Sequence, residues 1–240
     1  MTLAGNGARA PRSAAARRKL PLGERATEAL RRAILSGRYR PGERLVEDRL
    51  SVELGISRVP IREALRTLAG DGLVEVRPRR GATVATISPS TAQDLIEVRA
   101  ALEGLNARLA ARHPQPKIIA ELNRVLAAGN AAAARHNVAD LVRLNAAFHD
   151  KLAEAGRNTI LWDIMRTLRE RTGLVFARNT AARAGTDWSE HAQILAAVID
   201  GDEELAALLS TRHVRRAGEA AVAAATPAVD AGAAVGARRG

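Results

Sequence analysis

The sequence predicts a mainly α-helical protein with two parts: a small N-terminal part that ends in a β-hairpin, and a larger part that is all-α. Two observations favour this fold class. Apolar residues recur at the helical period through most of the chain, and the alternating pattern of strands is clearest in residues 73–87. With 240 residues, the chain is long enough for one large or two modest domains.

Residues 44–70 predict two short amphipathic helices joined by a tight turn. Leu45, Leu50 and Leu54 line one face of the first helix, and Gly55 ends it. Ser57 is a candidate N-cap for the second helix. The apolar face of that helix follows i, i+3, i+4 and i+7 spacing with Ile61, Ala64, Leu65 and Leu68.

The opposite face of the second helix is basic, with Arg58, Val59, Arg62 and Arg66. Because Arg58 and Arg62 are one turn apart, both side chains can point into the major groove of DNA. A short helix whose apolar face is fully used and whose free face carries arginine is suited to an anionic partner.

A basic hairpin follows these helices. Residues 73–76 and 82–87 predict two strands, and the Pro and Gly between them predict a turn that carries Arg77, Arg79 and Arg80. Gly81 would let the backbone approach a sugar-phosphate chain closely. Residues 21–87 therefore predict a winged helix-turn-helix, and the alternative is an ordinary basic helical pair with a hairpin.

The charge distribution agrees with double-stranded DNA as a partner. The formal net charge is +11, and residues 1–90 hold 18 Arg and Lys against 9 Asp and Glu. Residues 91–240 hold 19 Arg and Lys against 17 Asp and Glu, so most of the excess positive charge lies in the first part. None of the five aromatic residues lies among the basic motif residues, which argues against recognition of single strands by base stacking.

The segments SRVPIREALRTLAGDGLV and PRRGATVA resemble the DNA-binding domain of the GntR family of bacterial transcription regulators. The resemblance covers about residues 22–87 and implies a set of DNA-contacting residues: Arg49, Ser57, Arg58, Val59, Arg62, Arg79, Arg80 and Gly81. The family usually has Thr where this chain has Val59. Valine can still contact a thymine methyl group, but a hydroxyl contact to phosphate is lost.

From Ser90 onward the pattern predicts an antiparallel bundle of six helices. The first helix carries a stripe formed by Leu95, Val98, Leu102, Leu105 and Leu109. The expected helices span residues 92–112, 116–135, 138–155, 158–178, 188–200 and 202–223. Gly185 is expected near a break, and Asp187 is a candidate cap for the helix from residue 188.

Three histidines on three of these helices form a candidate metal site. His149 follows Asn145 by four residues, so both side chains project from one helix face. With His191 and His213, they would suit a divalent transition metal with open positions. The alternative is that the histidines are satisfied core residues or surface residues, as expected for His113 and His136.

The segment from about residue 90 to residue 220 is similar to the FCD ligand-binding domain of the FadR subfamily of GntR regulators. EVRAALEGLNARLAA resembles its first helix, NAAFHDKL its metal motif, and EHAQILAAVIDGD the following histidine helix. The resemblance implies that zinc or nickel is held by Asn145, His149, His191 and His213. It also implies that Arg99 faces the cavity, where it would bind a small carboxylate effector.

These patterns predict a ligand-responsive transcription regulator and not an enzyme. We expect a homodimer that binds a short inverted repeat, with repression relieved by the carboxylate. One alternative is a metal-dependent hydrolase or lyase fused to a DNA-binding head, although Asp150 and Glu190 would point away from their neighbouring histidines. The other alternative is a regulator whose histidines are purely structural.

The expected domain organisation has four parts. A disordered basic arm spans 1–20, the winged helix-turn-helix 21–87, the FCD-like bundle 90–223, and a disordered tail 224–240. No apolar run reaches the ~18 residues of a membrane span, the first 20 residues lack the apolar core of a secretory signal, and the chain has no cysteine. We therefore expect a cytoplasmic protein without membrane contact.

Overall fold

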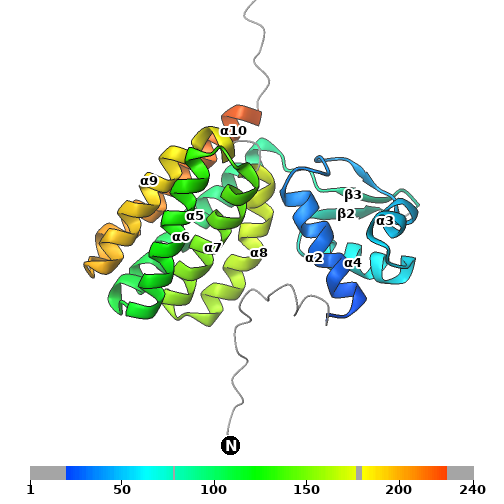
Figure 1. Cartoon of the computed structure of the whole chain (residues 1–240). Coiled ribbons are helices and arrows are strands. Elements are labelled where there is room, and N and C mark those ends of the chain that lie inside the picture. The colour runs from blue at the N-terminus through cyan, green and yellow to red at the C-terminus, as the bar shows by residue number, and fades with distance from the viewer. Residues whose placement is uncertain (1–19, 78, 177–179, 226–240) are drawn as a thin grey trace, which may run out of the picture. The chain divides into compact units, whose positions relative to one another are not determined.

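In the computed structural model, the chain divides into two compact units, Met1–Thr86 and Ile87–Gly240 (Figure 1). The structure describes residues 20–77, 79–176 and 180–225. The basic arm expected for residues 1–20 and the tail expected for 224–240 lie outside the described residues, apart from the positions next to α2 and α10. No helix in the described ranges is both long and apolar enough to cross a membrane.

The first unit is a winged helix-turn-helix, as the sequence predicts. It contains α2 (Leu22–Leu35), α3 (Glu47–Leu54) and α4 (Arg58–Gly70), with a small sheet of β1 (Arg44–Leu45), β2 (Val74–Arg77) and β3 (Gly81–Val84). The strand order is β1-β3-β2, and both pairs are antiparallel. The β2–β3 hairpin is the expected wing.

The turn between α3 and α4 follows the sequence pattern closely. Gly55 ends α3 with a left-handed φ of 62°, and α4 buries the four apolar residues expected of it. Ser57 is the N-cap residue, but its side chain makes no capping hydrogen bond. Leu45 does not belong to the helical face predicted for it, because it lies in β1 and pairs with Ala82 of β3.

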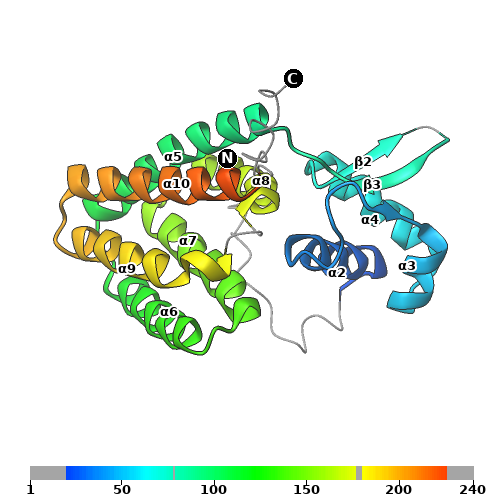
Figure 2. The ribbon, with the colours of Figure 1, turned by 90° about the horizontal axis from the view of Figure 1, so that it is seen from above.

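The second unit is the expected helical bundle. Its described residues form six helices: α5 (Pro89–Arg112), α6 (Pro116–Ala134), α7 (Val138–Gly156), α8 (Thr159–Phe176), α9 (Thr180–Ile199) and α10 (Glu203–Ala225). Helix α5 lies along α10, and Figure 2 shows the two side by side. A core cluster that includes Leu122, Phe148, Leu152 and Ile194 joins α6, α7 and α9.

Two predictions within the bundle are wrong. Helix α9 begins at Thr180 and not at 188, so Gly185 and Asp187 lie inside it. The leucine stripe on α5 is not its buried face: Val98 is 53% exposed and Leu105 is 42% exposed. The buried face of α5 carries small and polar residues instead, because α10 approaches it closely at Gly104.

Candidate metal centre and DNA-binding surface

The structure places all eight candidate DNA-contacting residues at the surface of the first unit. Val59, at the start of α4, is 63% exposed. At the wing turn, Arg79 and Gly81 adopt left-handed φ angles of 61° and 82°. Glycine adopts such an angle without strain, so Gly81 suits a tight wing.

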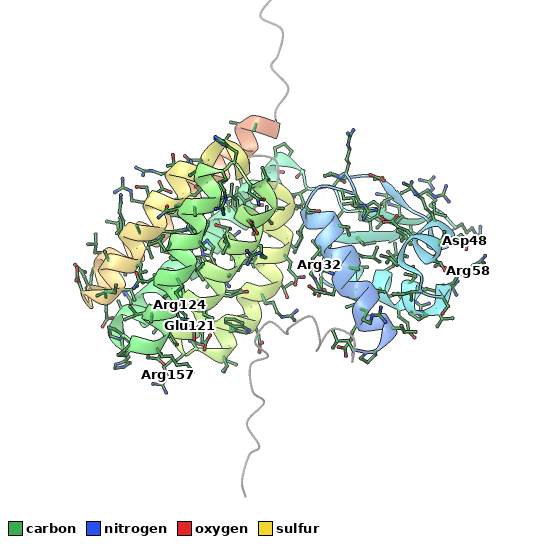
Figure 3. All side chains as sticks on the ribbon, in the orientation of Figure 1. Arg32, Asp48, Arg58, Glu121, Arg124 and Arg157 are labelled. Carbon is green, nitrogen blue, oxygen red and sulfur yellow. The ribbon has the colours of Figure 1, made fainter. Side chains whose placement is uncertain are left out.

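The two arginines expected to enter the major groove are ion-paired to α3. Arg62 binds Glu47 through two nitrogens, with Nε–Oε1 and Nη2–Oε2 distances of 3.0 Å and 2.8 Å. Arg58 pairs through Nε with Asp48, and Figure 3 labels these two side chains at the surface. Neither acidic partner follows from the helical pattern of the sequence.

Three buried imidazoles converge inside the second unit. His149 comes from α7, His191 from α9 and His213 from α10, and they are at most 4% exposed. One ring nitrogen from each lies within 4.8 Å of those of the other two. The Nε2 atoms of His191 and His213 are 3.2 Å apart.

Carboxylates lie beside two of these rings, although Nδ1 of His149 makes no hydrogen bond to its neighbour. The Nδ1 atom of His213 donates a hydrogen bond of 2.8 Å to Glu190, and Nδ1 of His149 lies 3.5 Å from Glu103. Both contacts leave Nε2 as the nitrogen available at the centre of the cluster. Carboxylates behind histidine ligands are the common arrangement at protein metal sites, where they fix the ring and the tautomer.

Burial favours the neutral form of two of these histidines, His149 and His191. It lowers the pKa of His149 to about 4, and it lowers the pKa of His191 well below its usual value. A neutral imidazole has a free lone pair, which metal coordination requires. Nδ1 of His191 is also buried without a hydrogen-bond partner in the described part of the chain.

The donor set fits a divalent transition ion. Metal–nitrogen bonds of about 2.1 Å place two ligand nitrogens about 3.0 Å apart at a right angle and about 3.4 Å apart at the tetrahedral angle. The 3.2 Å between His191 and His213 lies between these values. Three imidazoles without thiolates are typical of zinc and nickel sites.

A cavity of about 50 Å³ adjoins the cluster, with room for a few water molecules or a small anion. Asn145, His149 and His213 line it, so the structure brings the amide and two of the histidines to one space. Arg99 lines the same cavity and is only 6% exposed. Its Nη1 donates a 2.7 Å hydrogen bond to Thr172, and its guanidinium lies 4.9 Å from the centre of the Phe176 ring.

Several charged residues around the cavity were missed or misjudged from sequence. Glu103 on α5 is fully buried, and its carboxylate accepts a 2.9 Å hydrogen bond from Arg169 of α8. Glu190 was expected only to point away from its neighbour His191, and the structure adds a contact that the spacing did not predict, because α10 brings His213 against its carboxylate. Asp187 also lines the cavity and is paired with Arg183 at 2.9 Å.

Comparison with known families identifies both units. The model of the FCD domain matches residues 94–216, and that of the bacterial regulatory proteins of the gntR family matches residues 22–84. The chain belongs to the GntR family. It is a DNA-binding transcriptional regulator with an FCD domain, as the resemblance predicts, and GntR regulators bind DNA.

Curated relatives of this GntR regulator carry names of the same class. YdhC of Bacillus subtilis, an HTH-type transcriptional regulator, is 29% identical over 182 residues, which cover 74% of this chain and 80% of the relative. The Nta operon transcriptional regulator of Aminobacter aminovorans is 29% identical over 189 residues, or 76% of this chain and 86% of the relative. The HTH-type transcriptional repressor RspR of Escherichia coli is 32% identical over 149 residues, which cover 62% of this chain and 65% of the relative.

Solved structures of GntR proteins share the fold. Escherichia coli McbR/YncC superposes with a TM-score of 0.78 at 21% identity, covering 86% of this chain and 100% of that one. A putative GntR transcriptional regulator from Rhodococcus sp. RHA1 superposes with a TM-score of 0.73 at 24% identity, covering 84% of this chain and 97% of that one. At these identities the likeness concerns the fold alone.

Proposed function

We propose that this GntR regulator is a metal-dependent repressor whose operator binding is relieved by a small carboxylate. The observation that carries the proposal is the cluster of three buried histidines next to a cavity that an arginine also lines. The name of the repressor RspR supports repression as the direction of control.

The proposed ion is divalent, with zinc or nickel as the favoured metals. His149, His191 and His213 would hold it, and the side-chain oxygen of Asn145 would be a fourth ligand. When bound, the ion supplies a positive charge and open positions for an anion. A hydrogen bond to Glu190 holds the His213 ring in place for it, and the Glu103 carboxylate lies beside the His149 ring.

Arg99 is proposed as the cationic partner of the effector. Its guanidinium has several donors, and a carboxylate in the cavity would accept two of them in a bidentate pair. The cavity is small, so the effector is expected to be a compact hydroxy acid, sugar acid or dicarboxylate. The effector changes DNA binding only if it binds two arrangements of the regulator with different affinity.

The DNA-bound form is proposed to be a homodimer on a short inverted repeat in the cytoplasm. Helix α4 would enter the major groove with Arg58, Val59 and Arg62, while Arg49 and Ser57 contact the backbone and the wing residues Arg79, Arg80 and Gly81 lie along the sugar-phosphate chain. Replacing Arg58 with Ala is expected to cost about 1–3 kcal/mol of specific DNA affinity. Unchanged affinity of that variant for a selected operator would show that α4 is not the recognition helix.

A thermal-shift screen against small carboxylates, with and without a chelator, tests the proposed sensor. A ligand that binds only the folded state raises the melting temperature. We expect one class of acid to stabilise the metal-loaded protein, and we expect the chelator to abolish the shift.

The outcomes separate the proposal from its alternatives. If neither acid nor chelator changes the melting temperature, the histidines form a structural cluster and DNA binding is controlled in another way. If the bound acid is instead turned over, measured by loss of substrate, the hydrolase or lyase alternative is supported.

A further inference from the structure

Two adjacent acidic residues on α3 form ion pairs with two arginines that lie one helical turn apart on α4. Glu47 pairs with Arg62, and Asp48 pairs with Arg58. All four side chains are at least 32% exposed, so these ion pairs lie on the surface and add little to the stability of the fold. Their position on the proposed recognition helix gives them another consequence.

The Arg62–Glu47 pair occupies one edge of the guanidinium. The carboxylate accepts from Nε and Nη2, so the edge formed by Nη1 and the second hydrogen of Nη2 faces away from it. That outer edge has the two parallel donors that match O6 and N7 of guanine in the major groove. Arg58 is likewise paired through Nε, so both of its terminal nitrogens remain available to contact a base.

The pairing also limits what the arginine can do elsewhere. A free arginine on a DNA-facing helix reaches any nearby phosphate, which adds affinity without sequence information. The Arg62 guanidinium lowers the pKa of Glu47, so this carboxylate is ionised and its repulsion of phosphates is retained beside the helix. Holding the arginine at a fixed angle therefore favours contact with a base edge over contact with the backbone.

We propose that Glu47 is a specificity-determining residue, which positions Arg62 to read one guanine in each half-site, with Asp48 positioning Arg58 in the same way. Glu47 touches no base itself and acts through the arginine. The inference rests on the proposed role of α4 as the recognition helix, so the test includes a variant that examines that role separately.

The experiment uses the full-length protein and a duplex library with a random 20-base-pair core. Selection with the wild type gives its preferred sequence, and the variants E47Q, R62K and E47Q/R62K are then selected in the same way. E24Q is the matched control, because it removes one negative charge from an exposed position in the first turn of α2. Fluorescence anisotropy measures affinity for the wild-type sequence and for a random duplex over a range of salt concentrations.

For E47Q we expect the preference for guanine at one position of each half-site to weaken. The ratio of specific to random affinity should fall about tenfold, while random-duplex affinity rises and its salt dependence steepens by about one phosphate contact. E24Q should retain the wild-type preference and ratio. In the R62K background, the Glu47 replacement should change the ratio no further, because the arginine edge that it positions is gone.

Three results would overturn the inference. E47Q could select the same sequence with the same ratio, or E24Q could change the ratio as much as E47Q does. E47Q could also lose random-duplex affinity while its melting temperature is unchanged, which would make Glu47 a requirement for docking and not for specificity. If R62K itself leaves the selected sequence unchanged, the proposed recognition helix is wrong, a failure distinct from that of Glu47.

Discussion

An amide at position 145 sets the charge of the proposed ion site. Three neutral imidazoles and Asn145 would leave a divalent ion with its full charge, whereas an aspartate there would cancel one unit. We expect Asn145→Asp to retain the metal more tightly and to bind the carboxylate effector more weakly. Competition with a chromophoric chelator measures retention, and Asn123→Asp, at an exposed position of α6, is the control. Equal or weaker retention in Asn145→Asp would contradict the prediction.

Protonation of buried histidine makes the stability of the metal-free protein depend on pH. Burial lowers the pKa of His149 to about 4, against about 6.5 in the unfolded chain. Between these values the unfolded chain binds more protons, so the free energy of unfolding falls as the pH falls through this window. His191 acts in the same direction.

His149 alone should therefore cost about 2 kcal/mol between pH 7.5 and pH 5. Urea unfolding at the two pH values, with a chelator present, measures the loss. His149→Gln should reduce the pH dependence, while His113→Gln, at an exposed position, should not. Stability that is equal at both values would show that the ring is accessible to protons in the folded state.

The helical pattern predicts the three histidines that the structure brings together, but not the carboxylates that lie beside them. Helical spacing was enough to place Asn145 and His149 on one face. The carboxylates of Glu103 and Glu190 act across helices, and a tertiary contact leaves no periodic signal in a single sequence. The ion pairs between α3 and α4 were missed for the same reason.

At the scale of elements, two glycines inside helices are expected to respond oppositely to alanine. A Cβ at Gly129 on α6 would lie 2.4 Å from ring atoms of Trp188, which is fully packed, whereas a Cβ at Gly185 on α9 meets nothing within 4 Å. We expect Gly129→Ala to destabilise the fold by about 1–3 kcal/mol through overpacking. Gly185→Ala should stabilise it by about 0.5–1 kcal/mol through helix propensity. Denaturant midpoints compare the two, and a stabilising Gly129→Ala would show that Trp188 moves aside freely.

Gly185 also shows why one helix boundary was predicted wrongly. Gly185 indicated a helix break, but a single glycine costs only about 1 kcal/mol in a helix, and its alanine-rich surroundings outweigh that. On α5 the large residues suggested the buried face. Close packing against α10 instead requires small residues on that face. The same face also carries Arg99 and Glu103, which belong to the candidate site. The order of the six bundle helices was nevertheless predicted correctly, because proline, asparagine and aspartate mark most of their ends.

For the whole molecule, apolar side chains on the outside of the bundle support the proposed homodimer. Ile160 and Ile164 of α8 are 70% and 52% exposed and are one helical turn apart. We expect the double replacement of both by Glu to yield a monomer in analytical ultracentrifugation and to weaken binding to a duplex with two half-sites. Val52→Glu, at an exposed position of α3, is a control for solubility and should leave the oligomeric state unchanged. A dimer that survives the double replacement would exclude this face of α8 as the contact.

Helix α5 carries Arg99 and Glu103 and begins only five residues after β3 ends, at Pro89. Its 24 residues form one uninterrupted rod of about 36 Å. Hydrogen bonds along a helix make it stiff along its axis, so an axial displacement imposed near Glu103 reaches Ser88 with little loss. Four residues, 85–88, connect β3 to α5. If the proposed carboxylate draws Arg99 toward the histidines and shifts α5 along its axis, that shift is transmitted to the start of the connection to the wing through covalent bonds, without any need for a specific contact between the two units.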